Sequence, residues 1–330
     1  MSANKRREAL LNEYKGNIYE FLVAQNLSQI HGVESSFIKN IGQDFYEMLS
    51  QQESYIREYY PWLLSDLPLL ARGMALEIDK SLKSPLAHVK MIGKASSSLK
   101  DNYGEEDILA VYDNSSLAPI SLKLSKAGAF VNTKSAGVKS FLKKYFHNFP
   151  NIEQHQLRVS DLFDRQYELM SYSLQEAAGM EPDGKFENWK MAGATELPGE
   201  LSPELRERFL ETLRQVNNIL FETLLEMANK DQDMFLKNLK PLLGRTRDDM
   251  LQATTFYERQ KERYALQSHI VESGTGEKDS LEFLELKNRE AATSFDIVFA
   301  DRILQIRLKA MNKFTSKGFK INCAVKRSVC

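Results

Sequence analysis

Features that would assign this chain to several familiar classes are missing from its sequence. Only two cysteines occur in 330 residues, Cys323 and Cys330, too few for a disulfide framework or a zinc site built on cysteines. No apolar run approaches the roughly 18 residues that a membrane span needs. The N-terminal residues lead into an amphipathic pattern rather than the apolar core of a signal peptide. We therefore expect a cytoplasmic protein without a membrane segment.

Motifs of several enzyme classes are also absent. There is no glycine-rich Walker loop, which argues against a nucleotide-driven motor, and no Gly-x-Ser-x-Gly elbow. The five histidines are scattered and form no zinc pair. With 42% hydrophobic and 27% charged residues the composition is that of a globular protein, long enough for one large domain or two ordinary ones.

Acidic residues are missing from two long segments, although the net charge of the chain is only −1. No acid occurs between Asp113 and Glu153, where there are six lysines, and none follows Asp301, where there are eight lysines and arginines. Two basic segments in a nearly neutral protein predict a positive surface that faces a polyanion. Chance clustering on a solvated face is the alternative.

A strand hairpin is predicted over residues 107–126, which overlaps the start of the first acid-free segment. The apolar run 107–112 and the alternating run 120–126 are separated by Asp, Asn, Ser and Pro, which is typical of a turn between strands. Because side chains alternate along a strand, Ser121 and Lys123 share a face. Normal pairing lets the Asp107 carboxylate and the Lys123 amine converge. An acid that holds a divalent cation and a lysine beside the attacking water are the minimum for metal-assisted phosphodiester hydrolysis.

This arrangement resembles the PD-(D/E)xK nucleases, and in particular the type II restriction endonucleases, with the HaeIII-like subgroup as the nearest suggestion. The segments that carry the resemblance are Lys15–Glu20, Gly104–Asp107, Ser121–Lys123 and Asn132–Gly137. Two residues depart from the pattern: Glu106 stands where the motif has proline, and Ser121 where it has an acid. The resemblance implies that Asp107 ligates Mg²⁺, that Lys123 orients the attacking water, and that Ser121 contributes its backbone carbonyl at the usual acid position.

A second carboxylate is expected from the N-terminal helix, predicted over residues 4–26. Glu20 lies off the apolar stripe of this helix, beside Gly16, Val23 and Ala24, whose small side chains allow another backbone to approach. The resemblance implies that Glu20 is a metal ligand in place of the acid missing at Ser121. A solvated Glu on a helix surface is the alternative.

DNA contacts are predicted in both acid-free segments. The short polar side chains of 132–137 suit base edges or phosphate oxygens, or equally a plain capping turn before a helix at 138–146. The cations of the C-terminal segment suit the phosphate backbone, or the solvated face of an edge hairpin. The candidates are Asn132, Thr133, Lys134, Ser135, Lys139, Arg307, Lys309, Asn312, Lys313 and Lys317.

The predicted fold is α/β, a restriction-endonuclease-like central mixed sheet flanked by helices, with a large helical insertion. Residues 1–150 would form the nuclease core with its catalytic hairpin, 151–290 a mainly helical region, and 291–330 a basic β segment that returns to the core. Further elements are predicted as a strand at 88–93, helices at 161–178 and around Leu205–Met227, an exposed helix at 246–268, a flexible link at 273–276, and strands at 295–299 and 303–309.

The function that the resemblance implies is Mg²⁺-dependent cleavage of double-stranded DNA at a short specific sequence. It also implies a cognate DNA methyltransferase as genetic partner, and a homodimer is the geometric expectation for a two-strand cut at a palindrome. Two alternatives remain open: a repair or recombination nuclease of the same superfamily, and a non-catalytic DNA-binding protein.

Overall fold

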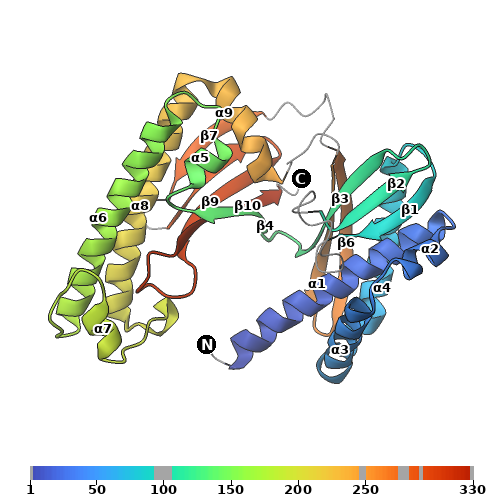
Figure 1. Cartoon of the computed structure of the whole chain (residues 1–330), viewed down its shortest axis with the longest axis horizontal. Coiled ribbons are helices and arrows are strands. Elements are labelled where there is room, and N and C mark those ends of the chain that lie inside the picture. Colours follow the sequence, from blue (N-terminus) through green and yellow to red (C-terminus); the bar gives the residue numbers. More distant parts are fainter. Residues whose placement is uncertain (1–2, 93–105, 245–249, 274–281, 290–292, 328–330) are drawn as a thin grey trace. The chain divides into compact units, whose positions relative to one another are not determined.

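The computed structural model of the chain in Figure 1 describes residues 3–92, 106–244, 250–273, 282–289 and 293–327. The chain forms two compact units. Unit 1 contains residues 1–129 and 247–278, and unit 2 contains residues 130–246 and 279–330. The chain therefore passes between the units three times, and each unit has a sheet and a hydrophobic core of its own.

Unit 1 is built on a mixed five-stranded sheet, here called sheet A, in the order β1-β2-β3-β5-β6. The first three strands form an antiparallel meander, β5 runs parallel to β3, and β6 returns antiparallel to β5. The helices precede the sheet in the chain. The elements are α1 Ala3–Ile30, α2 Glu34–Lys39, α3 Gln43–Tyr59, α4 Leu63–Ser81, β1 Leu86–Met91, β2 Ile108–Tyr112, β3 Leu117–Lys126, β5 Leu251–Gln260 and β6 Arg263–Ser273.

Strands β2 and β3 are joined by a short turn that their sequence favours. The Asn114 side chain accepts hydrogen bonds from the backbone N–H and the hydroxyl of Ser116, at 2.9 and 2.6 Å. Ser115 has a positive φ of 64°, and the Tyr112 N–H closes the turn on the Ser116 carbonyl. A local side-chain-to-backbone bond of this kind stabilises a turn. It fixes the register in which Ile108 pairs with Ile120.

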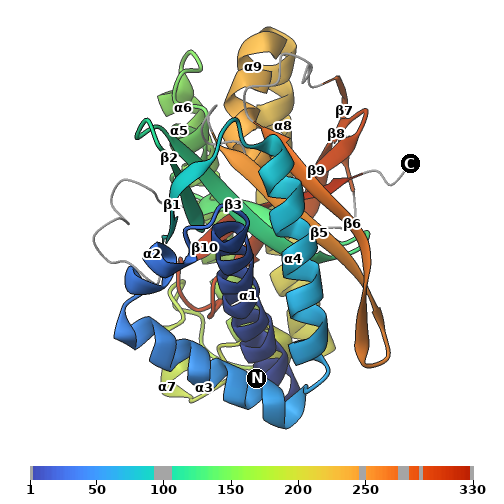
Figure 2. The same ribbon diagram turned by 90° about the vertical axis from the view of Figure 1, so that its right-hand side faces the viewer.

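One face of sheet A packs against α1 and α4. Ile108, Ile120 and Leu122 belong to the same buried cluster as Tyr19 and Val23 of α1, and Figure 2 shows α1 and α4 running along the sheet. Burial of these apolar side chains is the main stabilising contribution to unit 1, on the order of 25 cal/mol per Å² of apolar surface. Ser121 and Lys123 therefore lie on the other face of the sheet.

Buried polar contacts also join α1 to sheet A. The Lys15 ammonium donates to the hydroxyls of Tyr257 and Tyr264, at 3.0 and 3.1 Å. Nearby, the Tyr19 hydroxyl lies 2.5 Å from the Thr255 hydroxyl, which lies 2.8 Å from His269 Nδ1. Buried polar groups are costly unless they are hydrogen-bonded, so these contacts fix the position of the helix on the sheet.

Unit 2 contains an antiparallel five-stranded sheet, here called sheet B, in the order β4-β10-β9-β8-β7. Helices α6 and α8 lie side by side along it (Figure 1). One face of sheet B and these helices enclose an aromatic-rich core that includes Phe163, Phe314 and Phe319. The elements are β4 Val131–Gly137, α5 Phe141–Tyr145, α6 Ile152–Ala177, α7 Glu187–Met191, η2 Pro198–Glu200, α8 Pro203–Lys230, α9 Gln232–Leu239, η3 Lys240–Leu243, β7 Phe283–Asn288, β8 Ser294–Phe299, β9 Arg302–Ala310 and β10 Phe319–Arg327.

The long helix α8 has sequence signals at its N-terminus and along its length. Ser202 caps it by accepting from the Leu205 N–H, and Pro203 occupies the first helical position, where its missing N–H is harmless. The apolar residues that recur along it, among them Phe209, Leu213 and Leu220, are buried. The heptad-like stripe is therefore core packing within unit 2.

Most of the predicted elements are confirmed. The hairpin, the strand at 88–93, the helices at 161–178 and 205–227 and the strands at 295–299 and 303–309 all correspond to elements of the structure, with shifted ends. The chain is α/β, with two sheets in its described part. The predicted link at 273–276 lies outside the described residues, except for Ser273 at the end of β6.

Three predictions were wrong. Residues 251–260 and 263–268 lie in strands β5 and β6 rather than in a helix, because β-branched and aromatic side chains such as Thr254, Thr255 and Phe256 favour a strand. Residues 132–137 form strand β4 rather than a loop. The C-terminal segment pairs with β4 in unit 2, and the first division falls at residue 129 rather than 150.

Among the described residues, no helix is both long and apolar enough to cross a membrane.

The half-buried His269 makes a testable contribution to stability. Burial lowers its pKa, although Glu77 acts in the opposite direction, and Gly73 of α4 lies so close that an added Cβ would be 2.4 Å from His269 Nε2. The folded state therefore prefers the neutral ring. The contribution of His269 is fully present above the ordinary histidine pKa of about 6.5 and is lost as the pH falls through the lowered folded value.

We expect His269→Gln to lose less of its free energy of unfolding between pH 7.5 and 5 than the parent, measured by urea denaturation. His147→Gln, at an exposed position, is the matched control and should behave like the parent. Equal losses in the parent and His269→Gln would contradict the role of His269.

Candidate active site

Asp107 lies immediately before β2, on the same face of sheet A as Ser121 and Lys123. Its backbone N–H donates to the Ile120 carbonyl at 2.9 Å, which continues the β2–β3 ladder. Its carboxylate turns back onto β3, where Oδ2 accepts from the Leu122 backbone N–H at 2.6 Å. A carboxylate that accepts a backbone N–H is held in a fixed orientation.

Lys123 and Ser121 complete the group of side chains around this carboxylate. Lys123 Nζ lies 3.8 Å from Asp107 Oδ2, with 31% of the lysine and 21% of the aspartate side chain exposed. Ser121 Oγ lies 3.5 Å from the same oxygen. The convergence of Asp107 and Lys123 predicted from the hairpin is therefore present in the structure, with Ser121, two residues before Lys123 in β3, beside the same carboxylate oxygen.

Burial raises the pKa of the Asp107 carboxyl above its ordinary value, and Glu106 contributes in the same direction. The ammonium of Lys123 and the hydrogen bonds from Leu122 and Ser121 act against this. Because desolvation is the largest effect, the ionised carboxylate lacks full compensation from its neighbours. Such a carboxylate gains from a further positive charge.

Two side chains of β5 belong to the same face and were not found in the sequence. Gln252 is in register with Ser121, and Thr254 with Lys123, across the parallel β3–β5 pair. Thr254 is buried and Gln252 half-buried. They were missed because residues 246–268 were interpreted as a helix. The β-branched and aromatic run Thr254–Tyr257 is the signal that identifies the strand on which they lie.

Glu20 lies on α1, half-buried and next to Tyr19. Tyr19 contacts Thr255, which shares a face with Leu122 and Leu124 rather than with Lys123. Helix α1 thus covers the apolar face of sheet A. The assignment of Glu20 as the second metal ligand stays a prediction.

The donor atoms around Asp107 fit a hard divalent cation such as Mg²⁺. This ion takes oxygen ligands and is usually held by one or two protein carboxylates together with water and substrate phosphate. Asp107 supplies one carboxylate, whose ionised form is disfavoured by burial, and Ser121 supplies an adjacent hydroxyl. No group of three or more histidines, cysteines or acids suited to a metal occurs within the described ranges.

Unit 2 carries a second surface of interest, the face of sheet B that points away from the helices. Because register and alternation fix which side chains share this face, they fall into rows across the strands. We call this set the polar face. Its first row holds Lys309 and Lys320, its second Ser135, Asn322, Arg307 and Ser294, and its third Asn132, Gln305 and Asp296.

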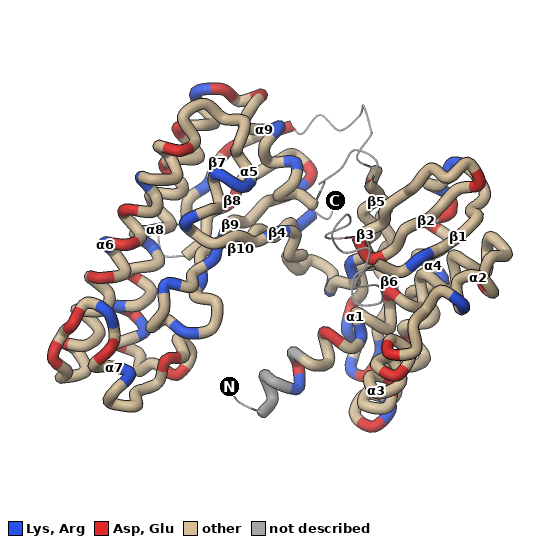
Figure 3. Tube along the Cα trace, in the orientation of Figure 1, with Lys and Arg blue, Asp and Glu red and all other residues tan. Residues whose placement is uncertain are grey.

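Positive charge is crowded on the polar face. The pKa of Lys309 is lowered by burial and by the neighbouring cations Lys320 and Arg307. Among the described residues, none of these three forms an ion pair with a carboxylate. Figure 3 shows lysines and arginines on β9 and β10, whereas acids are frequent along α6. The two acid-free segments thus meet in one sheet, as β4 beside β10 and β9.

Of the predicted DNA contacts, Asn132, Ser135, Arg307 and Lys309 lie on the polar face. Thr133 and Lys134 have other partners. The Thr133 hydroxyl donates to the carbonyls of Leu242 and Cys323. Lys134 is buried on the core side, opposite Cys323, where burial and Lys144 lower its pKa to about 8.

The remaining predicted cations are bound in ion pairs. Lys139 and Lys317 both contact Asp164 of α6, the latter at 2.6 Å, and Lys313 contacts Glu196 at 2.5 Å. Asn312 is exposed in the turn between β9 and β10. The ion pairs tie this turn to the helical side of unit 2, where Phe314 is fully buried.

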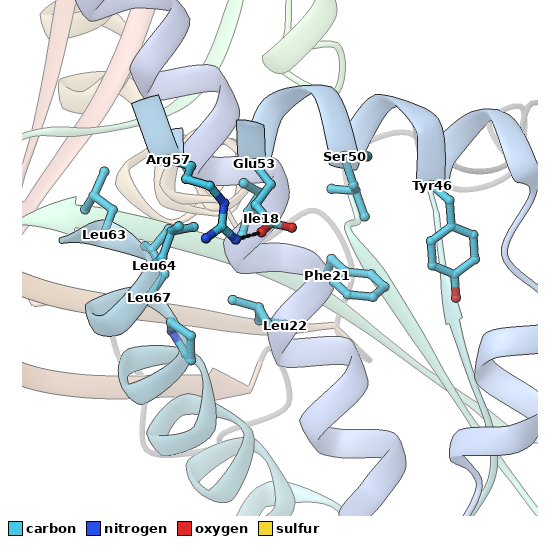
Figure 4. A pocket seen from close by; sticks show the side chains of 12 residues that line it. Ile18, Phe21, Leu22, Tyr46, Ser50, Glu53, Arg57, Leu63, Leu64 and Leu67 are labelled. Carbon is cyan, nitrogen blue, oxygen red and sulfur yellow. Dashed lines mark hydrogen bonds and ion pairs between the residues drawn. The ribbon is translucent and has the colours of Figure 1, made fainter. Parts of the chain in front are cut away.

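A cavity of about 410 Å³ lies between α1, α3 and α4, away from the Asp107 group. Figure 4 shows its apolar lining, which includes Phe21, Leu22 and Leu64, and the Glu53–Arg57 ion pair at 2.5 Å. None of the candidate site residues lines it.

Comparison with known proteins gives no relative: no protein-family model, no curated protein and no solved structure matches this chain.

The raised pKa of Asp107 leads to a prediction about stability. With a raised folded pKa, the favourable contribution of the protonated form is fully present below the unfolded value of about 3.9 and is lost as the pH rises through the folded value. At neutral pH without metal, Asp107→Asn should therefore melt higher than the parent, by about 2–4 °C per kcal/mol of relieved desolvation. The difference should shrink towards pH 4.

The exposed turn residue Asp113 provides the control, since Asp113→Asn should leave the melting temperature unchanged. Adding Mg²⁺ should raise the melting temperature of the parent more than that of Asp107→Asn. A lower melting temperature of metal-free Asp107→Asn at neutral pH would show that the carboxylate stabilises the fold.

Proposed function

We propose that the chain is a Mg²⁺-dependent endonuclease that hydrolyses phosphodiester bonds of double-stranded DNA at a short specific sequence, as type II restriction endonucleases do. The observation that carries the proposal is the placement of the Asp107 carboxylate and the Lys123 ammonium on neighbouring strands, 3.8 Å apart. The mixed sheet with helices on its apolar face agrees with the restriction-endonuclease-like fold that the resemblance implies.

In this proposal each residue of the group has a separate role. Asp107 would hold Mg²⁺, which when bound supplies Lewis-acid stabilisation of the phosphate oxygens. The Leu122 N–H keeps one carboxylate oxygen in place. The Lys123 ammonium orients the attacking water and stabilises the negative charge that develops on the phosphate. A new bond then forms between the water oxygen and phosphorus as the bond from phosphorus to the leaving sugar oxygen breaks; the water gives a proton to solvent and the leaving oxygen takes one up from solvent.

The polar face of sheet B supports a nucleic-acid substrate. Lys320 and Arg307 are close enough to Lys309 to disfavour its charged form, in addition to the effect of burial. A polyanion relieves this repulsion and releases counterions when it binds. Lys139, Lys313 and Lys317 are already neutralised by acids of unit 2, so we assign them to the fold rather than to DNA.

The partners follow from the same proposal. A restriction endonuclease requires a cognate methyltransferase that protects the host DNA, and a homodimer is expected for a two-strand cut at a palindromic site.

A non-catalytic DNA-binding protein is the second candidate. It is favoured by Ser121, which stands where the resembled nucleases have a carboxylate. Salt-dependent DNA binding without Mg²⁺-dependent cutting would support it.

Replacing the two central side chains tests the catalytic assignment. Asp107→Ala should abolish Mg²⁺-dependent cleavage of duplex DNA and leave binding nearly intact, because removing the carboxylate also removes repulsion of phosphate. Lys123→Met should lose on the order of 100-fold or more in rate. Both rates are measured from the conversion of supercoiled plasmid under single-turnover conditions.

Lys126→Met is the matched control, because Lys126 is an exposed lysine on the same strand. Its rate should equal that of the parent. A fully active Asp107→Ala enzyme would remove Asp107 from the site. Discrete plasmid fragments distinguish a restriction enzyme from a repair nuclease, which cuts particular DNA structures.

A further inference from the structure

The polar face of sheet B contains more than cations. Asn322 of β10 is half-buried between Arg307 of β9 and Ser135 of β4, and Gln305 of β9 is half-buried one row further on, between Ala324 of β10 and Asp296 of β8. Their amides present both donors and acceptors, a combination that is not needed to hold phosphate. Lys309 and Lys320 lie in the row next to that of Asn322, about 7 Å away along the strands, and two rows, about 14 Å, from Gln305.

Two acceptors of this face lack a donor. Asn322 Oδ1 and Asp296 Oδ1 are buried and accept no hydrogen bond within the part of the chain that the structure describes. The other oxygen of Asp296 accepts from Arg289 at 2.6 Å. A buried acceptor without a donor is unfavourable, so it usually has a structural or binding reason. Amino groups on base edges are donors of the kind that such acceptors take.

We infer that the polar face reads DNA sequence in the major groove, with Gln305 and Asn322 as the residues that determine specificity. The inference rests on the proposed function and adds which residues recognise the bases. Strands are known to enter the major groove, and planar amides pair with the edge of adenine through one donor and one acceptor. Lys309 and Lys320, in the outer row, contact phosphates and supply affinity without sequence information.

The test is binding, measured in EDTA so that no cleavage occurs. The parent protein is first used to select from a pool of randomised 30-base-pair DNA duplexes, and the enriched sequence is compared with a scrambled duplex by fluorescence anisotropy. Gln305→Ala and Asn322→Ala should each reduce the preference for the enriched duplex by about 5- to 150-fold, the discrimination of one bidentate base contact. Binding to the scrambled duplex should change by less than about twofold.

Two further variants separate affinity from recognition. Lys309→Gln and Lys320→Gln should weaken binding to both duplexes alike. Each should reduce the magnitude of the slope of log affinity against log salt by about 0.9. Lys313→Gln is the control, because Lys313 is paired with Glu196, and its slope should equal that of the parent. Melting temperatures establish that each variant is folded, and either amide variant alone is sufficient for the test.

The outcomes distinguish the inference from the proposed function. A parent that prefers one sequence while both amide variants keep its full preference overturns the inference and leaves the nuclease proposal standing. A parent protein that cuts DNA but enriches no sequence also overturns the inference about base recognition. A parent that binds no duplex DNA, or binds only RNA, overturns both.

Discussion

The register of β3 is the constraint on which the candidate active site depends. This strand is paired on both sides, antiparallel with β2 and parallel with β5. Ile120 and Leu122 are buried against the helices, which requires that Ser121 and Lys123 lie on the opposite face. A slip of one residue would turn every side chain of β3 over and bury the lysine. The apolar core therefore fixes the position of the ammonium beside Asp107.

The contacts of α1 and of the turn support this register from two sides. Lys15 and Tyr19 bind side chains of β5 and β6, which hold the helix against the sheet. Asn114 closes the turn between β2 and β3. The Leu122 N–H then holds the Asp107 carboxylate in a place where burial raises its pKa. An acid kept in an unfavourable environment is typical of a functional site, where stability is given up for chemistry.

The cations of unit 2 fall into two groups, those in ion pairs and those on the polar face. Lys313 and Lys317, within the β9–β10 turn, are paired with acids of unit 2, Glu196 and Asp164. Arg307, Lys309 and Lys320 are left on the polar face without such partners among the described residues. A net charge of −1 therefore coexists with a locally positive face. Proximity in sequence does not decide which cations are free to bind a polyanion; tertiary ion pairs do.

Local patterns in the sequence predicted the parts of the site that local physics controls. The turn residues and the alternation at 120–126 were sufficient to place Asp107 near Lys123. The division of the chain was not predictable in this way, because β4 pairs with a strand almost 190 residues later in the sequence. Gln252 and Thr254 were missed because Arg, Glu and Gln around them suggested an exposed helix. The ion pairs of Lys313 and Lys317 were not predictable either, because their partners, Glu196 and Asp164, are more than 100 residues away.

The proposed chemistry is tested most directly by the ends of the DNA fragments that it would generate. The protein is incubated with a long duplex of known sequence, of the size of a phage genome, with and without Mg²⁺, and the fragment ends are sequenced. A site-specific nuclease built on Asp107 and Lys123 gives ends that share one short sequence, and only when Mg²⁺ is present. Intact DNA in Mg²⁺, or cleavage that proceeds equally well in EDTA, would contradict it.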